Sequence, residues 1–187
     1  MIRRIVITGP ASTGKTTLTK QLAAHYNTEF AEEFARRMLE EQNNTYKKED
    51  LVMFSYGQVA TENLAFGKVE MELMVGKAYK KLPQNTNKFV FLDTDLITIK
   101  IWSEYKYGDC DKKILQQIEE REYDGYLLCG IDVPWEDDPQ RENPNNRAEL
   151  YELYKQELLH YNKKFIELTG DKDKRFKEAV RWLIASF

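Results

Sequence analysis

The chain has 187 residues, of which 42% are hydrophobic and 32% charged, a composition typical of one soluble globular domain and not of a disordered chain. No stretch has the pattern of a signal peptide or a membrane span, and Cys110 and Cys129 lack a CxxC spacing, so we expect a cytoplasmic protein with no disulfide framework and no membrane partner. The 28 basic residues against 31 acidic ones give a net charge of −3, which argues against a dedicated nucleic-acid binder.

Short apolar runs alternate with segments of helical period along the chain. The runs that favour strands are Arg4–Thr8, Thr28–Ala31, Lys88–Leu92, Tyr126–Cys129 and Lys164–Leu168. The segments that favour helices are Thr16–Tyr26, Phe34–Gln42, a long region from about Lys48 to Leu82, Ile114–Glu122, Arg147–Tyr161 and Lys172–Ala185. This alternation predicts βαβ units in an open parallel sheet with helices on both faces, within one domain over residues 1–187.

The strongest motif follows the first strand directly and opens the first helix. Residues 9–16 read GPASTGKT and fit GxxxxGK[ST], the P-loop. Gly9 and Gly14 let the backbone turn its N–H groups toward a phosphate, Lys15 reaches the β- and γ-phosphates, and the Thr16 hydroxyl can ligate Mg²⁺. We therefore expect ATP to be bound by Gly9, Ala11, Ser12, Thr13, Gly14, Lys15, Thr16 and Thr17.

A second signal is the buried strand candidate that ends in Asp93. An acid at the carboxyl end of such a strand is where a Mg²⁺ partner belongs in a P-loop enzyme, so we expect Thr16 and Asp93 to hold the metal. Asp95 lies two residues on. Its two open interpretations are contact with the substrate and the N-cap of the helix that follows.

The segment from Glu32 to Arg36 follows the second strand candidate, where the first crossover after a P-loop passes the γ-phosphate. A carboxylate there can take the proton from an attacking hydroxyl, and we assign this role to Glu33. An ordinary first turn of a helix explains the same acids. The choice of general base among Glu32, Glu33, Asp93 and Asp95 stays open at this point.

The irregular stretch of residues 134–147, PWEDDPQRENPNNR, predicts a mobile lid over ATP. Arg141 and Arg147 within it suit a catalytic role, because the planar guanidinium matches the charge that develops on a transferred phosphoryl group. A solvated loop is the alternative. The remaining side chains that we expect to bind the acceptor substrate are Glu32, Phe34, Arg36, Tyr56, Asp95 and Trp102.

Taken together, these motifs resemble the nicotinamide-riboside kinase domain of the NadR family. The resemblance runs from about Arg4 to about Leu183 and rests most on the stretches DTDLITIKIW and DVPWEDDPQRE, together with GPASTGKTTLTKQLA, EEFARRMLEE and FIELTGD. It implies a three-layer P-loop fold like that of nucleoside kinases, with five parallel strands in the order 2-3-1-4-5. It also implies transfer of the γ-phosphate of ATP to the 5′-hydroxyl of nicotinamide riboside.

Two other functions stay open. One is a kinase for another vitamin-like alcohol or nucleoside, such as thiamine. The other is a P-loop ATPase that acts as a regulatory module. A GTPase is not expected, because the sequence has no guanine-binding NKxD motif. The sequence gives no oligomeric state.

Overall fold

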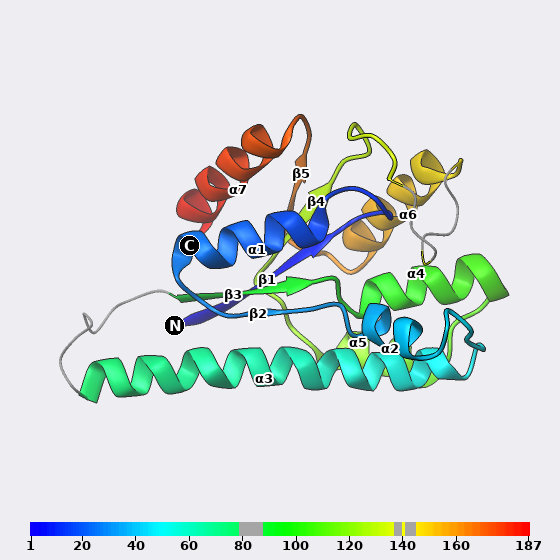
Figure 1. The fold of residues 1–187 in the computed structure, drawn as a ribbon, viewed down its shortest axis with the longest axis horizontal. Helices are drawn as coiled ribbons and strands as arrows, with labels where there is room; N and C mark the ends of the chain where they lie inside the picture. The colour runs from blue at the N-terminus through cyan, green and yellow to red at the C-terminus, as the bar shows by residue number, and fades with distance from the viewer. Residues whose placement is uncertain (79–87, 137–139, 141–144) are drawn as a thin grey trace.

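The computed structural model describes residues 1–78, 88–136, 140 and 145–187. Five parallel strands form one sheet in the order β2-β3-β1-β4-β5, which confirms the predicted order (Figure 1). The strands are β1 (Ile2–Thr8), β2 (Phe30–Ala31), β3 (Lys88–Asp93), β4 (Gly125–Cys129) and β5 (Phe165–Leu168). The carboxyl ends of β1, β3 and β4 therefore meet at one edge, where ligands bind in such sheets.

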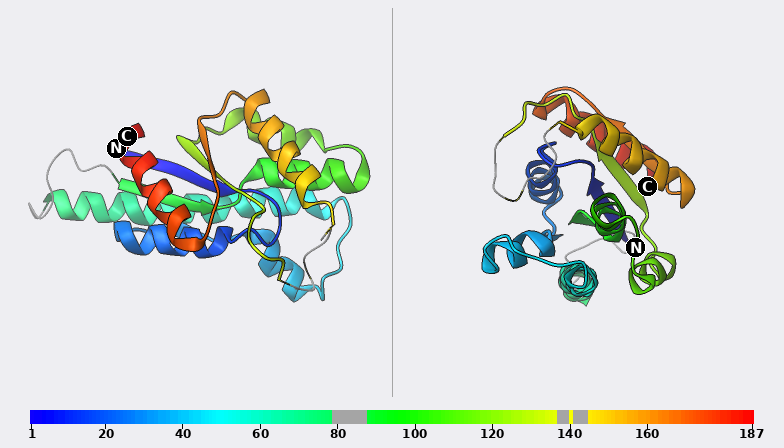
Figure 2. Two further views of the ribbon diagram at one scale, coloured as in Figure 1. Left: turned by 90° about the horizontal axis from the view of Figure 1, so that it is seen from above. Right: turned by 90° about the vertical axis from the view of Figure 1, so that its right-hand side faces the viewer.

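Helices cover both faces of the sheet (Figures 1 and 2). They are α1 (Lys15–Tyr26), α2 (Phe34–Glu41), α3 (Asp50–Ala78), α4 (Leu96–Tyr107), α5 (Lys112–Glu120), α6 (Arg147–His160) and α7 (Lys172–Ser186). The helices α1 and α7 pack on one face, and α2 to α6 contribute to the core on the other face.

Alternation along the strands explains the three layers. Ile5 and Ile7 of β1 pack toward α1 and α7, whereas Val6 between them packs into the core of the opposite face. Strand β4 repeats the pattern, with Leu127 on the first face and Tyr126 on the second. Because successive side chains of a strand point to opposite faces, a fully apolar strand must be covered on both sides.

Several helix and strand boundaries in the structure differ from the predicted ones. Strand β1 begins earlier than expected, at Ile2, because its register with β3 starts at the pair Ile2–Lys88. Strand β2 has only two residues, both paired with β3. Helix α4, anticipated only as the helix that follows Asp95, extends over twelve residues. The predicted end of α3, from residue 79 to 82, lies outside the described residues.

Among the described helices, none combines the length and the apolar character that a membrane span requires.

A buried glutamate lies between α3 and the segment that leads into β4. Glu62 is fully buried and accepts hydrogen bonds from the Arg121 guanidinium and the Tyr123 hydroxyl, each at 2.9 Å. Burial penalises the ionised carboxylate and outweighs the attraction of Arg121, so the pKa of Glu62 is raised from 4.5 to about 7. A proton on Glu62 therefore stabilises the folded state.

We expect the free energy of unfolding to fall as the pH rises from about 5 to about 8. The contribution of Glu62 is fully present below its unfolded pKa and is lost as the pH passes its folded pKa, a change on the order of 1–3 kcal/mol. Urea unfolding at several pH values measures this slope. Glu62→Gln should flatten it, whereas Glu119→Gln, at an exposed position on α5, should not. An unchanged slope in Glu62→Gln would contradict the assignment.

Candidate functional site

The P-loop connects the carboxyl end of β1 to the first turn of α1, as its motif predicts. Gly9 has φ of 131°, and a Cβ there would lie 2.7 Å from the carbonyl oxygen of Cys129 on the neighbouring strand β4. Gly14 has φ of 78° at the N-cap of α1. Both positions therefore require glycine, the first for space and conformation and the second for conformation alone.

Three cations hold the backbone carbonyls of the P-loop. Lys15 Nζ donates to the Pro10 carbonyl oxygen at 2.8 Å. Arg147 donates to the carbonyl oxygen of Ser12 at 3.0 Å, and Arg175 donates to that of Thr13 at 2.7 Å. Since α1, α6 and α7 each supply one of these cations, the loop is fixed from three helices before a phosphate binds.

Arg175 is the residue of this set that sequence reasoning missed. It is only 4% exposed, it also donates to the Gly130 carbonyl oxygen at 2.9 Å, and it pairs with the carboxylate of Asp132. It thereby joins the P-loop to the end of β4. A usable signal was present, because Arg175 shares the i, i+4, i+8 stripe of Ala179 and Leu183, both buried, and a charge on such a stripe indicates a buried partner.

Asp93 and Thr16 lie in direct contact at the base of the P-loop. The Thr16 hydroxyl donates to Asp93 Oδ2 at 2.6 Å, and Asp93 is only 2% exposed. The other oxygen, Oδ1, is buried without a hydrogen-bond partner among the described residues. Burial raises the pKa of Asp93, so its ionised form needs a nearby cation. An orphaned carboxylate oxygen beside a hydroxyl fits a hard divalent cation that also takes ligands from water and phosphate.

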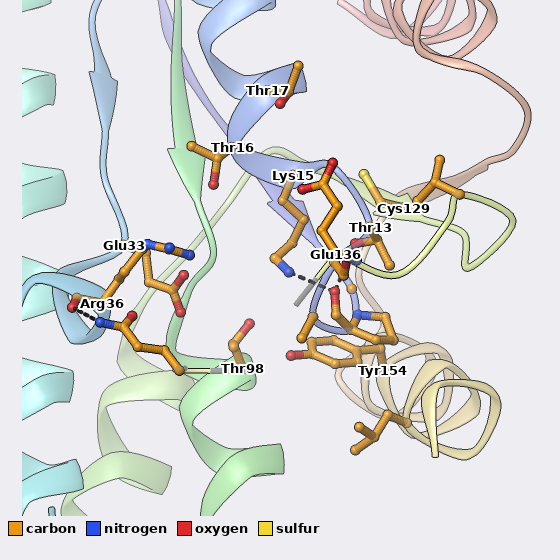
Figure 3. A pocket seen from close by; sticks show the side chains of 18 of the residues that line it. Thr13, Lys15, Thr16, Thr17, Glu33, Arg36, Thr98, Cys129, Glu136 and Tyr154 are labelled. Carbon is orange, nitrogen blue, oxygen red and sulfur yellow. Dashed lines mark hydrogen bonds between the residues drawn. The ribbon is translucent and has the colours of Figure 1, made fainter. Parts of the chain in front are cut away.

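A cavity of about 540 Å³ opens from the P-loop toward α2, α4 and α6 (Figure 3). Its phosphate end is formed by the P-loop, including Lys15. Glu33 and Arg36 reach it from the α2 side, across from Lys15 and from Tyr154 of α6 (Figure 3). This volume suits a small-molecule ligand.

The end of the cavity away from the P-loop is rich in aromatic rings. Trp102 and Tyr105 of α4 line it together with Tyr46. Trp102 Nε1 donates to the Tyr46 hydroxyl at 2.8 Å, and the Trp102 ring stacks on Phe54 with centroids 6.0 Å apart. Lys106 Nζ lies 4.1 Å from the centroid of Tyr46. The rings are therefore held in place by the core and by each other.

The structure brings only part of the predicted acceptor set to this cavity. Arg36 and Trp102 line it, as does Glu33, whereas Glu32 is exposed and lies 3.9 Å from Lys20. Glu32 and Glu33 are adjacent in the sequence, but of the two only Glu33 lines the cavity.

Three further predicted residues do not line the cavity. The Phe34 ring packs against Gly57 of α3, where a Cβ would meet it at 2.1 Å. Tyr56 is 54% exposed on the outer side of α3. Asp95 is fully buried, caps α4 through the Thr98 N–H and accepts a 2.9 Å hydrogen bond from the Tyr126 hydroxyl, so the N-cap interpretation matches its position.

The predicted lid is described in part. Arg141 lies outside the described residues, and so do its neighbours 137–139 and 142–144. Arg147 donates to the carbonyl oxygens of Ser12 and Val133, both at 3.0 Å, so it ties the start of α6 to the P-loop. The backbone N–H of Glu136 donates to Ser12 Oγ at 2.9 Å, and Gln140 Nε2 donates to the Arg36 carbonyl oxygen at 3.2 Å. This segment thus contacts both the P-loop and α2.

Residues 4–175 match the family model described as AAA domain. The chain belongs to this family. The P-loop, the parallel sheet and the acid at the end of β3 place this AAA domain in the P-loop NTPase superfamily.

Individual relatives agree with the resemblance that the motifs indicate. The chain is 27% identical over 184 residues to the trifunctional NAD biosynthesis/regulator protein NadR of Escherichia coli K12, and the match covers 96% of this chain but 41% of the relative. A solved NadR protein in complex with NR matches with a TM-score of 0.72 at 23% identity, covering 98% of this chain and 50% of that one. The chain thus spans half or less of these relatives. Thymidylate kinase from Ehrlichia chaffeensis matches with a TM-score of 0.62 at 14% identity, over 97% of this chain and 98% of that one.

Proposed function

We propose that the protein is an ATP-dependent kinase that phosphorylates the 5′-hydroxyl of nicotinamide riboside. The observation that carries this proposal is the continuity of one cavity, which joins the P-loop to an aromatic pocket formed by Tyr46, Trp102 and Tyr105. A phosphate-binding loop and a ring-binding pocket in one enclosure suit transfer between ATP and a ring-bearing alcohol.

The acceptor assignment draws support from the relatives. NadR of Escherichia coli is described as a protein of NAD biosynthesis, and a NadR protein has been solved with NR bound. A pyridinium ring is a cation, and stacking on aromatic faces such as Trp102 contributes roughly 0.5–2 kcal/mol. Thiamine shares both features, a cationic ring and a primary alcohol, and is therefore the competing acceptor.

Several side chains at the phosphate end receive a role in this proposal. Lys15 neutralises the β- and γ-phosphates, and Glu33 takes the proton of the attacking hydroxyl. Thr16 and Asp93 would hold Mg²⁺, which supplies positive charge next to the phosphoryl oxygens. Arg147 holds the two ends of the segment 134–147 against the P-loop through its hydrogen bonds to Ser12 and Val133. Arg141 neutralises charge that develops on the transferred phosphoryl group.

The remaining features fit one kinase domain over residues 1–187, with residues 134–147 as its lid. The thiols of Cys110 and Cys129 are free, which suits a reducing cytoplasm. Burial raises the pKa of Cys129 to about 11, so this thiol stays neutral beside the P-loop and takes no part in the chemistry.

We expect Asp93→Asn to lower kcat by at least about tenfold and to weaken the dependence of the rate on Mg²⁺. The amide keeps the size of the side chain but removes the negative charge on the oxygen that has no hydrogen-bond partner among the described residues. The effect on kcat should exceed the effect on KM for ATP, because the metal matters most when the phosphoryl oxygens gain charge. A magnesium titration at saturating ATP measures this, and an unchanged titration would remove Asp93 from the metal site.

The experiment that tests the function compares acceptors under identical ATP and Mg²⁺. Initial rates with nicotinamide riboside, thiamine, uridine and adenosine are followed by ADP formation, and the products are identified by mass. Nicotinamide riboside should give the highest kcat/KM. Trp102→Leu should raise KM for the riboside and leave KM for ATP unchanged. Exclusive turnover of another acceptor would overturn the riboside assignment, and slow hydrolysis stimulated only by a partner would favour an ATPase module.

A further inference from the structure

The long helix α3 is apolar on two opposite faces. Its inner face is buried against the sheet and its neighbours through Leu51, Phe54, Ala65, Val69 and Leu73. Its outer face carries six of the nine large hydrophobic side chains that are exposed among the described residues. They are Met53, Tyr56, Leu64, Met71, Met74 and Val75, with exposed fractions from 41% to 70%. A surface helix normally has one apolar face, so the second one requires an explanation.

These side chains form one continuous stripe. At about 100° per residue, they fall with Ala60 and Gly67 into a sector roughly 100° wide along the whole helix. We call these eight residues the outer stripe. The exposed charges Lys68, Glu70 and Glu72 fall outside this sector. Figures 1 and 2 show α3 at the margin of the molecule, with α2 and α5 beside it and no element beyond it.

Gly67 is a second observation on the same face. A Cβ at this position would meet no atom of the described residues within 4 Å, and its φ is not positive. Nothing in the described part of the chain therefore requires glycine here, although glycine weakens a helix interior relative to alanine. Gly57 of the same helix differs, because the Phe34 ring fills the space of its Cβ. Because glycine has no side chain, Gly67 lets another helix approach the exposed apolar face of α3 closely.

Six of the eight residues of the stripe are also placed symmetrically along the sequence. Three pairs are equidistant from the midpoint between Asn63 and Leu64, namely Met53 with Met74, Tyr56 with Met71, and Ala60 with Gly67. An antiparallel copy of the same helix would thus place large side chains against large ones and small against small. A two-fold interface has this self-complementarity, because each contact occurs twice.

We propose that the outer stripe of α3 is a dimer interface that packs antiparallel against α3 of a second copy of the chain. The exposed area of the stripe is on the order of 600 Å² per copy, so pairing buries roughly 1,200 Å², the lower end of the range for specific interfaces. Methionine and tyrosine are enriched in such interfaces, and charged residues are depleted at their centres. No described residue of α3 is among those that line the cavity, so two copies can pair with both sites accessible.

The first test is the mass of the protein in solution, measured by light scattering during gel filtration at micromolar concentration. The wild type should have twice the 22.1 kDa of one chain. Leu64→Glu should raise the dissociation constant at least about tenfold without changing the circular dichroism spectrum. Ile184→Glu is the matched control, because Ile184 is equally exposed at 72% but lies on α7. A monomeric wild type, or a dimer insensitive to Leu64→Glu, would overturn the proposal.

The second test asks whether the two α3 helices pair antiparallel or parallel, and it uses oxidative cross-linking in a Cys110→Ser background. A mixture of Met53→Cys chains and Met74→Cys chains should form mixed disulfide dimers, whereas Met53→Cys alone should not. The reverse result would show a parallel pair and overturn the antiparallel arrangement. Gly67→Ala separates a paired helix from an unpaired one. If α3 pairs with a second copy, the added methyl group should weaken dimerisation. If α3 is unpaired, the variant should only raise the midpoint of thermal unfolding.

Discussion

Replacing Lys15 with alanine is expected to lower kcat by at least about 100-fold with ATP and a reactive acceptor, and to leave the fold intact. The side chain is half-buried at the cavity and bonds to the Pro10 carbonyl oxygen of the P-loop itself, so it contributes little to the packing of the core. What the variant loses is the positive charge that the proposed mechanism places at the transferring phosphoryl group.

Steady-state kinetics, with thermal unfolding in parallel, separate lost catalysis from lost structure. Lys112→Ala is a suitable control, because Lys112 is an exposed lysine of α5 that does not line the cavity. Lys15→Arg keeps the charge but changes its geometry, so it should recover only part of the rate. If Lys15→Ala retained a rate near that of the wild type, the P-loop would not serve phosphoryl transfer in this protein.

The local features of the fold could be predicted because they follow from short-range physics. The P-loop motif, the strand before it and the helix after it are one continuous segment, and the topology of parallel sheets fixes where Asp93 lies relative to Thr16. The order of the strands is expected from the resemblance to the kinase domain of the NadR family, and the sheet has this order. A two-residue strand such as β2 leaves almost no periodic signal, so its bounds could not be predicted from the sequence.

The direction of individual side chains could not be predicted in the same way. Glu32 and Glu33 are neighbours in a turn whose sequence does not reveal which one faces the ligand. Tyr56 and Phe34 have the composition of a ring pocket, but one lies on the outer stripe and the other fills the space at Gly57. Arg175 and Tyr46 line the cavity although neither belongs to a motif; burial of Arg175 could be inferred from its helical stripe, but its contact with the P-loop appears only in the tertiary structure.

Glu33→Gln is expected to lower kcat by about 10²–10⁴-fold and to leave KM for ATP almost unchanged. Glu33 has extended backbone geometry at the N-cap of α2, with φ of −64° and ψ of 108°, and its side chain carries no capping hydrogen bond. The carboxylate lines the cavity across from Lys15 (Figure 3). An acceptor hydroxyl between them would have a proton acceptor on one side and the phosphoryl group on the other.

Comparison with the neighbouring Glu32 tests whether Glu33 is the general base. Glu32→Gln, on an exposed side chain beside Lys20, should change kcat by less than about threefold, because a group outside the cavity cannot take the proton of the attacking hydroxyl. Glu33→Asp should restore part of the activity, since it returns a carboxylate at a greater distance from the acceptor. Equal losses in the two variants would assign the general base to another carboxylate.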